Sequence, residues 1–192
     1  MRLFVAAEPS EQVRASAAAS VARLRDRLEA TSAGGGLRWV PANHLHLTVW
    51  FMGEVSEARA GAVLDAIRPA LDVPAFDLHL AGFGVFPPSG PPRVLWMGVT
   101  GGLEELAAAH DQIGARLAPW GFPPEARAYS AHLTVARITE APKGAARVAL
   151  RQVIADQAAD AGFCRIGQLT VFRSRTSPKG ALYEPLLRVP LS

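Results

Sequence analysis

The sequence predicts an α+β fold made of two pseudo-equivalent lobes that are related by an approximate two-fold axis. The tetrapeptide His-Leu-Thr-Val occurs at His46–Val49 and again at His132–Val135, an offset of 86 residues. Val85-Phe86 maps onto Val171-Phe172 at the same offset, and each motif is preceded by a helical pattern and followed by a helix and a strand. We therefore expect one bilobal domain over residues 1–192. Each lobe should be an antiparallel sheet with flanking helices, with a catalytic cleft between the lobes.

The first elements are a strand, a helix and the first motif strand. Met1–Ala7 is short and apolar, which is typical of a strand. Apolar residues at helical spacing predict a helix over Ser10–Thr31, with Ser10 as its N-cap and Gly34–Gly36 as its end. Leu45–Met52 is mostly apolar, β-branched and aromatic, and predicts a strand.

The middle of the chain predicts a helix, a pair of strands and a second helix. Helical spacing of apolar residues marks Ala60–Leu71, and two apolar runs predict strands over Phe76–Phe86 and Val94–Val99. The segment Pro87–Pro92 between them reads as a loop. Leu103–Trp120 is the clearest amphipathic helix in the chain.

The last elements repeat the order of the first. Ala128–Ala136 predicts the second motif strand, and apolar spacing predicts a helix over about Ala145–Ala158. Phe163–Phe172 and Ala181–Val189 predict the final strands, which flank a turn at Ser177–Gly180.

The composition is that of a globular protein and excludes several classes. The chain has 192 residues, of which 49% are hydrophobic and 19% charged, and it carries a net charge of +3. Cys164 is the single cysteine, so an internal disulfide framework is excluded. No apolar run is long enough for a membrane span and the N-terminus is not a signal peptide, so we expect a cytoplasmic protein. The chain has 18 Arg and only two Lys, and this excess of arginine indicates mainly a GC-rich genome.

The repeated motif suits phosphodiester chemistry. Side chains alternate along a strand, so His46 and Thr48 share one face, as do His132 and Thr134. If the lobes face each other, two imidazoles and two hydroxyls meet in one cleft. One neutral histidine can then accept a proton while a protonated one donates, and the hydroxyls can donate to phosphate oxygens. Arg137 could add a cation, but simple alternation places it on the wrong face unless a bulge intervenes.

Other candidate sites carry weaker signals. His44 lies two residues before His46 and shares its face of the strand, so a metal site with two histidine ligands is conceivable. No carboxylate or cysteine stands nearby at metal-ligand spacing, which argues against such a site. Cys164 lacks an activating motif and reads as a buried thiol. His79 is a lone strand residue, and His110 lies on a helical stripe of core or boundary positions.

The motif blocks resemble the 2H phosphoesterase superfamily, and most closely its RNA 2′,3′-cyclic phosphodiesterase branch, also called 2′-5′ RNA ligase-like. The resemblance covers essentially the whole chain. It rests on the motif blocks RWVPANHLHLTVWFMGEV and YSAHLTVAR, and on the segments RLFVAAEPS, FPPSGPPRVLWMGV and VFRSRTSPKGALYEPL. Ala131 stands where the family often has proline before the second histidine. This departure should affect backbone rigidity more than chemistry.

The resemblance implies metal-independent hydrolysis of an RNA 2′,3′-cyclic phosphate end, or of a nucleoside cyclic phosphate, to a 2′-phosphate. It implies no cofactor and no metal, with His46 as proton donor and His132 as proton acceptor. Thr48, Thr134 and Arg137 would hold the phosphate. It also implies weak joining of RNA ends through a 2′-5′ linkage in the reverse direction.

Two other functions stay open at the level of the sequence. The cleft could bind RNA ends or nucleotides without turnover, or it could hydrolyse another small cyclic phosphate such as an ADP-ribose-type product. Phe51, Phe86, Trp96 and Tyr129 could stack on a base or belong to the core. We expect a monomer that does not bind membranes.

Overall fold

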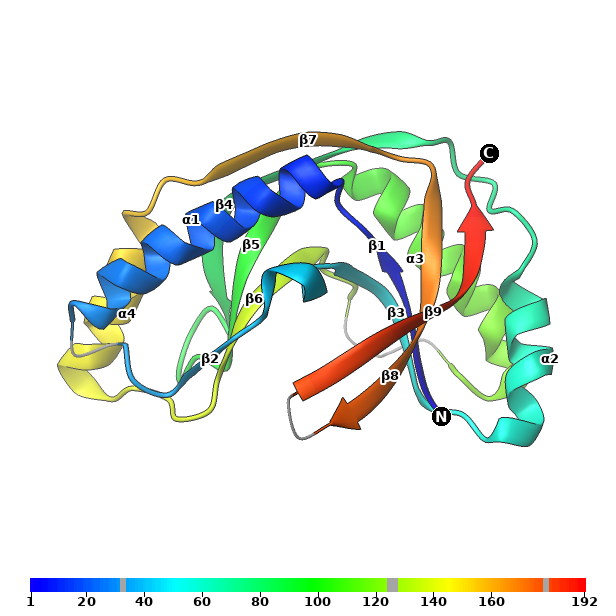
Figure 1. The fold of residues 1–192 in the computed structure, drawn as a ribbon, viewed down its shortest axis with the longest axis horizontal. Coiled ribbons are helices and arrows are strands. Elements are labelled where there is room, and N and C mark those ends of the chain that lie inside the picture. The colour runs from blue at the N-terminus through cyan, green and yellow to red at the C-terminus, as the bar shows by residue number, and fades with distance from the viewer. Residues whose placement is uncertain (32–33, 124–127, 178–179) are drawn as a thin grey trace.

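The computed structural model describes residues 1–31, 34–123, 128–177 and 180–192, and the predicted α+β class is confirmed (Figure 1). The helices are α1 (Glu11–Glu29), α2 (Glu57–Ile67), α3 (Leu103–Leu117) and α4 (Gly144–Ala155), with short 3-10 helices η1 (Ala42–His44) and η2 (Ala118–Trp120). The strands are β1 (Arg2–Ala7), β2 (Leu37–Trp39), β3 (Leu47–Glu54), β4 (Phe76–Phe86), β5 (Val94–Gly101), β6 (His132–Ile138), β7 (Asp160–Ile166), β8 (Gln168–Ser177) and β9 (Gly180–Pro190).

The strands form one curled antiparallel sheet in the order β7-β4-β5-β6-β3-β1-β8-β9, with β2 beside β6. We call β7, β4, β5 and β6 the central half-sheet, and β3, β1, β8 and β9 the terminal half-sheet. The two halves join where Leu47 of β3 pairs with Leu133 of β6. The predicted bilobal arrangement is confirmed, and the structure adds that the two antiparallel sheets are halves of a single sheet.

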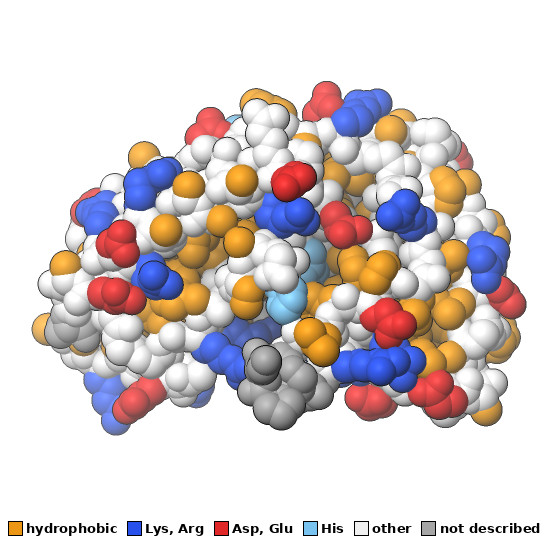
Figure 2. Space-filling view, in the orientation of Figure 1, with side chains coloured by type: hydrophobic (Ala, Val, Ile, Leu, Met, Phe, Trp, Pro, Cys, Tyr) orange, Lys and Arg blue, Asp and Glu red, His pale blue; other side chains and the backbone are white. Residues whose placement is uncertain are grey.

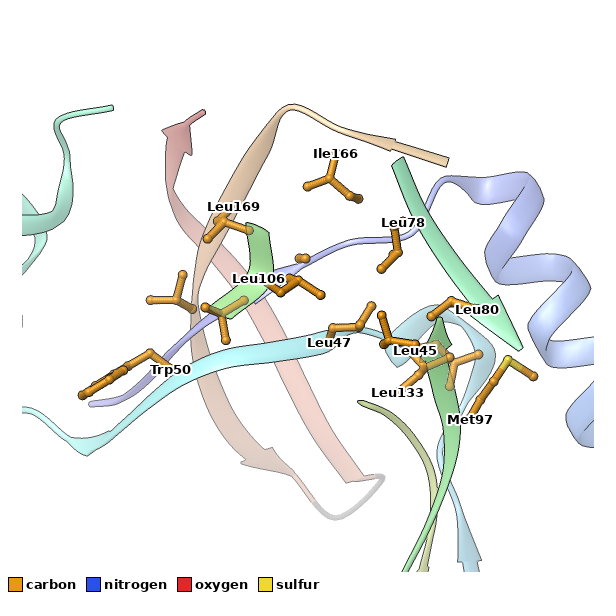
Figure 3. Packing of buried hydrophobic residues seen from close by; sticks show 14 of the residues in the cluster. Leu45, Leu47, Trp50, Leu78, Leu80, Met97, Leu106, Leu133, Ile166 and Leu169 are labelled. Carbon is orange, nitrogen blue, oxygen red and sulfur yellow. The ribbon is translucent and has the colours of Figure 1, made fainter. Parts of the chain in front are cut away.

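Each half-sheet carries two helices on its outer side (Figure 1). Helices α1 and α4 pack on the central half-sheet, and α3 packs on the terminal half-sheet beside α2. Between sheet and helices lies one continuous core, to which leucines of both halves contribute (Figure 3). Leu47, Leu80 and Leu133 are fully buried there. The four α-helices of the described residues therefore lie on the side of the sheet that this core occupies.

The two lobes do not correspond to the two halves of the chain. Helix α1 precedes β3 in the sequence but packs on the central half-sheet, and the last hairpin, β8–β9, pairs with β1 at the start of the chain. Each half-sheet therefore contains elements of both sequence repeats. It follows that neither repeat can complete its own sheet alone.

The predicted strand over Phe163–Phe172 is wrong, because the chain breaks into two strands at Gly167. Strand β7 pairs with β4, whereas β8 pairs with β1 in the other half-sheet. Ile166 and Leu169 on either side of the break are both buried, so the apolar pattern runs through it. Periodicity alone could not detect this crossing.

Smaller differences concern the ends of elements. Ser10 caps α1 as predicted, since its hydroxyl accepts a hydrogen bond from the Val13 backbone N–H at 3.3 Å. Helix α3 ends at Leu117 and gives way to η2, and the second motif strand begins at His132 rather than at Ala128. The proposed turn at Ser177–Gly180 includes Pro178 and Lys179, which lie outside the described residues.

No helix in the described part of the chain combines the length and apolar character that a membrane span requires.

Candidate active site

The two motif histidines occupy equivalent positions at the beginnings of β3 and β6. His46 directly precedes β3, and His132 is the first residue of β6. The Nδ1–H of His46 can donate to the His44 carbonyl at 2.7 Å, and that of His132 to the Ser130 carbonyl at 2.8 Å. Because the carbonyl two residues back can only accept, each ring keeps its Nε2 for proton exchange.

The pairing of Leu47 with Leu133 brings the two motifs together. These leucines are fully buried in the core, so alternation turns the neighbouring histidines and threonines to the inner side of the sheet. His46 and Thr48 flank Leu47 on one strand, as His132 and Thr134 flank Leu133 on the other. The two histidines are therefore brought to the same region of the inner side of the sheet.

A β-bulge turns Arg137 to the same side as the histidines. On β5, Trp96 pairs with Thr134 while the preceding residue, Leu95, already pairs with Ala136, so β6 carries one extra residue. Val135 and Ala136 are both buried as a result, and Arg137 is exposed. The bulge that a role for Arg137 requires is therefore present. The positive charge of Arg137 also lowers the pKa of His132.

Strand β3 has the matching bulge, which places Phe51 where β6 has Arg137. Val5 of β1 pairs with Trp50 and the next residue, Ala6, pairs with Thr48. The Phe51 ring follows the bulge and remains 46% exposed, with the Arg2 guanidinium 5.0 Å from its centroid. Both residues lie five positions after their histidine, so the duplicated sequence contained the signal for this equivalence.

Burial lowers the pKa of both imidazoles, but their charged neighbours differ in sign. For His46 the largest cause of the lowered pKa is desolvation, opposed by the hydrogen bond to His44 and by the charge of Glu8. For His132 desolvation is again the largest cause, and Arg137 lowers the pKa further against the hydrogen bond to Ser130. The charge of His44 also lowers the pKa of His46, so only Glu8 acts there in the opposite sense to Arg137 at His132.

Aromatic rings enclose both histidines. The Phe4 ring lies 4.9 Å from the His46 ring, and Tyr183 meets it edge-on at 5.2 Å. Phe86 meets the His132 ring edge-on at 5.0 Å. These ring contacts contribute to the burial of both imidazoles.

A pocket of 490 Å³ opens beside His132 and Thr48. Its lining includes Phe51, Phe86, His110 and Tyr129. Tyr129 stacks on His110 at 4.5 Å and donates its hydroxyl to the Thr48 carbonyl at 3.3 Å, and burial raises the pKa of its phenol. Three of the four aromatic residues considered for base stacking thus line this pocket, while Trp96 borders a neighbouring one. Sequence reasoning missed His110 as a lining residue.

Of the remaining candidates, His44 adjoins His46 through its carbonyl and through a shared contact with Tyr183, whereas His79 and Cys164 lie apart from this arrangement. His44 belongs to η1, and no set of three or more His, Cys, Asp or Glu side chains within the described ranges is placed to hold a metal ion. His79 bonds Asp160 at 3.0 Å and Thr100 at 2.6 Å on the outer strands of the central half-sheet. Cys164 is buried in β7.

This geometry defines a class: a bilobal fold in which two sequence repeats each contribute a His-x-Thr strand to one shared face. The family model of LigT-like phosphoesterases matches residues 12–96 and again residues 99–183. The chain therefore belongs to the LigT-like phosphoesterase family, as its motif blocks suggested. The double match also supports the internal duplication.

Individual relatives agree with this assignment. The chain is 32% identical over 169 residues to the RNA 2′,3′-cyclic phosphodiesterase of Aeropyrum pernix, covering 88% of this chain and 93% of the relative. It is 30% identical over 188 residues to that of Methanothermobacter thermautotrophicus, covering 97% and 96%.

Solved structures share the fold. The protein TT0787 of Thermus thermophilus superposes with a TM-score of 0.75 at 24% identity, covering 99% of this chain and 97% of that one. Escherichia coli LigT complexed with 3′-AMP gives a TM-score of 0.72 at 24% identity, covering 100% and 98%.

Proposed function

We propose that this protein is a hydrolase that opens RNA 2′,3′-cyclic phosphate ends to 2′-phosphates. The observation that carries the proposal is the pair of imidazoles on one face, each held through Nδ1 by the carbonyl two residues back. The activity named for the relatives supports it, since they are RNA 2′,3′-cyclic phosphodiesterases that match most of the chain. We further propose that residues 1–192 act as one bilobal domain, as a cytoplasmic monomer.

In the proposed reaction the two histidines exchange protons on opposite sides of the phosphorus. Neutral His132 accepts a proton from water through Nε2 as the water oxygen bonds to phosphorus. The bond from phosphorus to the 3′ oxygen breaks, and protonated His46 donates its Nε2 proton to that oxygen. The product carries a 2′-phosphate and a 3′-hydroxyl. Acid–base transfer of this kind contributes about 10²–10⁴-fold to a rate.

The resemblance of the motif blocks to the phosphodiesterase family assigns His46 as the acid and His132 as the base. The charge of Glu8 raises the pKa of His46 against the lowering effects of burial and of His44, and Arg137 lowers the pKa of His132. Thr48 and Thr134 donate hydroxyl hydrogen bonds to the non-bridging oxygens, where negative charge develops. Arg137 adds a cation to the same phosphate. In the reverse direction the same groups support weak 2′-5′ joining of RNA ends.

Hydrolysis of a 2′,3′-cyclic nucleotide in EDTA tests the proposal. His46→Ala and His132→Ala should each lower kcat by about 10²–10⁴-fold. His79→Ala, which removes a histidine from the outer strands, should retain wild-type turnover. Full activity in both motif variants would sink the mechanism, and a 3′-phosphate product would reverse the assignment of the leaving oxygen.

Each of the two alternative functions predicts a different result in binding and turnover assays. Tight binding of a 2′-phosphate without turnover of any cyclic phosphate would indicate a binding module. Turnover of a small cyclic phosphate of ADP-ribose type, with none of an RNA end, would indicate a different substrate.

A further inference from the structure

A pair of arginines lies on the inner side of the sheet, beyond the two motifs. Arg38 of β2 and Arg137 of β6 are direct partners across the two strands. Leu37 and Trp39 on either side of Arg38 pack against the core, so alternation turns the exposed Arg38 side chain away from the core. The bulge at Val135 turns Arg137 to that side as well.

Neither guanidinium is neutralised within the part of the chain that the structure describes. No carboxylate oxygen lies within 4.0 Å of either group, and neither group donates a hydrogen bond there. Like charges directly opposite each other destabilise a sheet, so this pair has an electrostatic cost that an anion would offset. Figure 2 shows Lys and Arg side chains beside the histidine surface in the middle of this face.

The two arginines lie beside the proposed reaction centre, farther along β6 and β2 than the motif residues. On β5, Trp96 pairs with Thr134 and Val94 pairs with Arg137, so two residues of strand separate the two positions. This corresponds to about 7 Å along the sheet. This distance is similar to the spacing between successive phosphates of a single-stranded RNA. The guanidinium fork of Arg38 is suited to the paired oxygens of a phosphodiester that lies next to the phosphate held by Arg137.

We infer that Arg38 forms a second phosphate subsite, next to the reacting phosphate that Arg137 holds in the proposed function, and that it binds the phosphodiester one nucleotide upstream of the cyclic end. The inference rests on the proposed function and specifies its substrate. An RNA end that carries at least one internal phosphodiester is bound better than a free nucleoside cyclic phosphate. Arg38 is a specificity residue and takes no part in the proton transfers.

Two substrates and three variants test this subsite. The substrates are a dinucleotide ending in a 2′,3′-cyclic phosphate and the matching nucleoside 2′,3′-cyclic phosphate. Arg38→Gln should lower kcat/KM for the dinucleotide by roughly 10-fold or more, because a charge-assisted hydrogen bond is lost. The nucleoside substrate should lose less than about twofold, since it has no upstream phosphate. Arg38→Lys, which keeps the charge and loses the fork, should fall between wild type and Arg38→Gln.

Arg25→Gln is the matched control, because it removes the same charge from an exposed position on α1. It should leave the ratio of the two kcat/KM values unchanged. Equal losses on both substrates in Arg38→Gln would overturn the inference, and so would no loss on either.

A binding measurement separates failure of the subsite from failure of the proposed activity. If the wild-type protein opened neither substrate, the proposed activity would be refuted. Its affinity for a short single-stranded RNA with a 2′-phosphate end could still be measured as a function of salt concentration. One lost phosphate contact lowers the slope of log affinity against log salt by about 0.7 for single strands. Fluorescence anisotropy should show that decrease for Arg38→Gln and not for Arg25→Gln. An unchanged slope in Arg38→Gln would overturn the subsite.

Discussion

Leu47→Ala tests whether the joint between the two half-sheets supports both stability and the site. Leu47 is fully buried and pairs with Leu133, directly between the two His-x-Thr faces. A fully buried Leu→Ala change lowers the free energy of unfolding by about 2.7–5 kcal/mol. In a chain of this size each kcal/mol shifts Tm by about 2–4 °C, so Tm should fall by about 5–20 °C.

The variant should also lose activity well below its Tm. His46 and Thr48 flank the substituted residue, and a displacement of about 1 Å at a reacting group can cost 10²-fold in rate. We therefore expect kcat/KM for a cyclic nucleotide to fall by about 10-fold or more at a temperature where the variant is folded.

Urea unfolding followed by the fluorescence of the four tryptophans measures the first effect, and the cyclic phosphate assay measures the second. Leu47→Met conserves volume and should cost less than about 1.5 kcal/mol. Leu182→Ala changes a side chain that is 55% exposed and should stay within about 0.5 kcal/mol of wild type. A loss below about 1 kcal/mol in Leu47→Ala, or an unchanged kcat/KM, would refute the role of this joint.

Four further outcomes follow from the site. Because burial lowers the pKa of both His46 and His132, the profile of kcat/KM against pH should be bell-shaped with its acidic limb below 6.5; a flat profile would contradict paired catalysis. Glu8→Gln removes a charge that raises the pKa of His46, so the alkaline limb alone should move to lower pH, whereas movement of the acidic limb would exchange the two roles. Because both pKa values are lowered by folding, the unfolded chain binds more protons than the folded chain below a pH of about 6.5. The free energy of unfolding, measured with urea, should therefore decrease as the pH falls through that range. An increase would contradict this expectation. Phe51→Ala should raise KM by about 5–100-fold if the exposed ring stacks on a base, which steady-state kinetics would measure against an unchanged Tm; an unchanged KM would exclude stacking.

Some of the site could be predicted because the relevant rule is local. Alternation along a strand placed each motif histidine and threonine on one face and each motif leucine on the other, and burial of Leu47 and Leu133 agrees with this. The need for a bulge before Arg137 followed from the same rule. The presence of that bulge did not, because it depends on how β5 pairs with β6.

Other features depend on partners that are distant in the chain. The break at Gly167 is invisible in the apolar pattern, because β7 and β8 are both buried while pairing with different strands. The placement of Arg38 beside Arg137 likewise needs β2 to add to the edge of β6, nearly a hundred residues away. A three-residue strand carries too little periodicity to be recognised alone.

The sequence by itself determined the α+β class, the duplication and the chemistry available to the site, since composition, periodicity and the repeated His-Leu-Thr-Val are properties of neighbouring residues. Only the tertiary structure decided that the repeats exchange elements between two half-sheets and that the motifs meet through Leu47 and Leu133. It also decided which arginines face the cleft. The physical reason is that register and bulges arise from hydrogen bonds and packing between strands far apart in the chain, which no local pattern encodes.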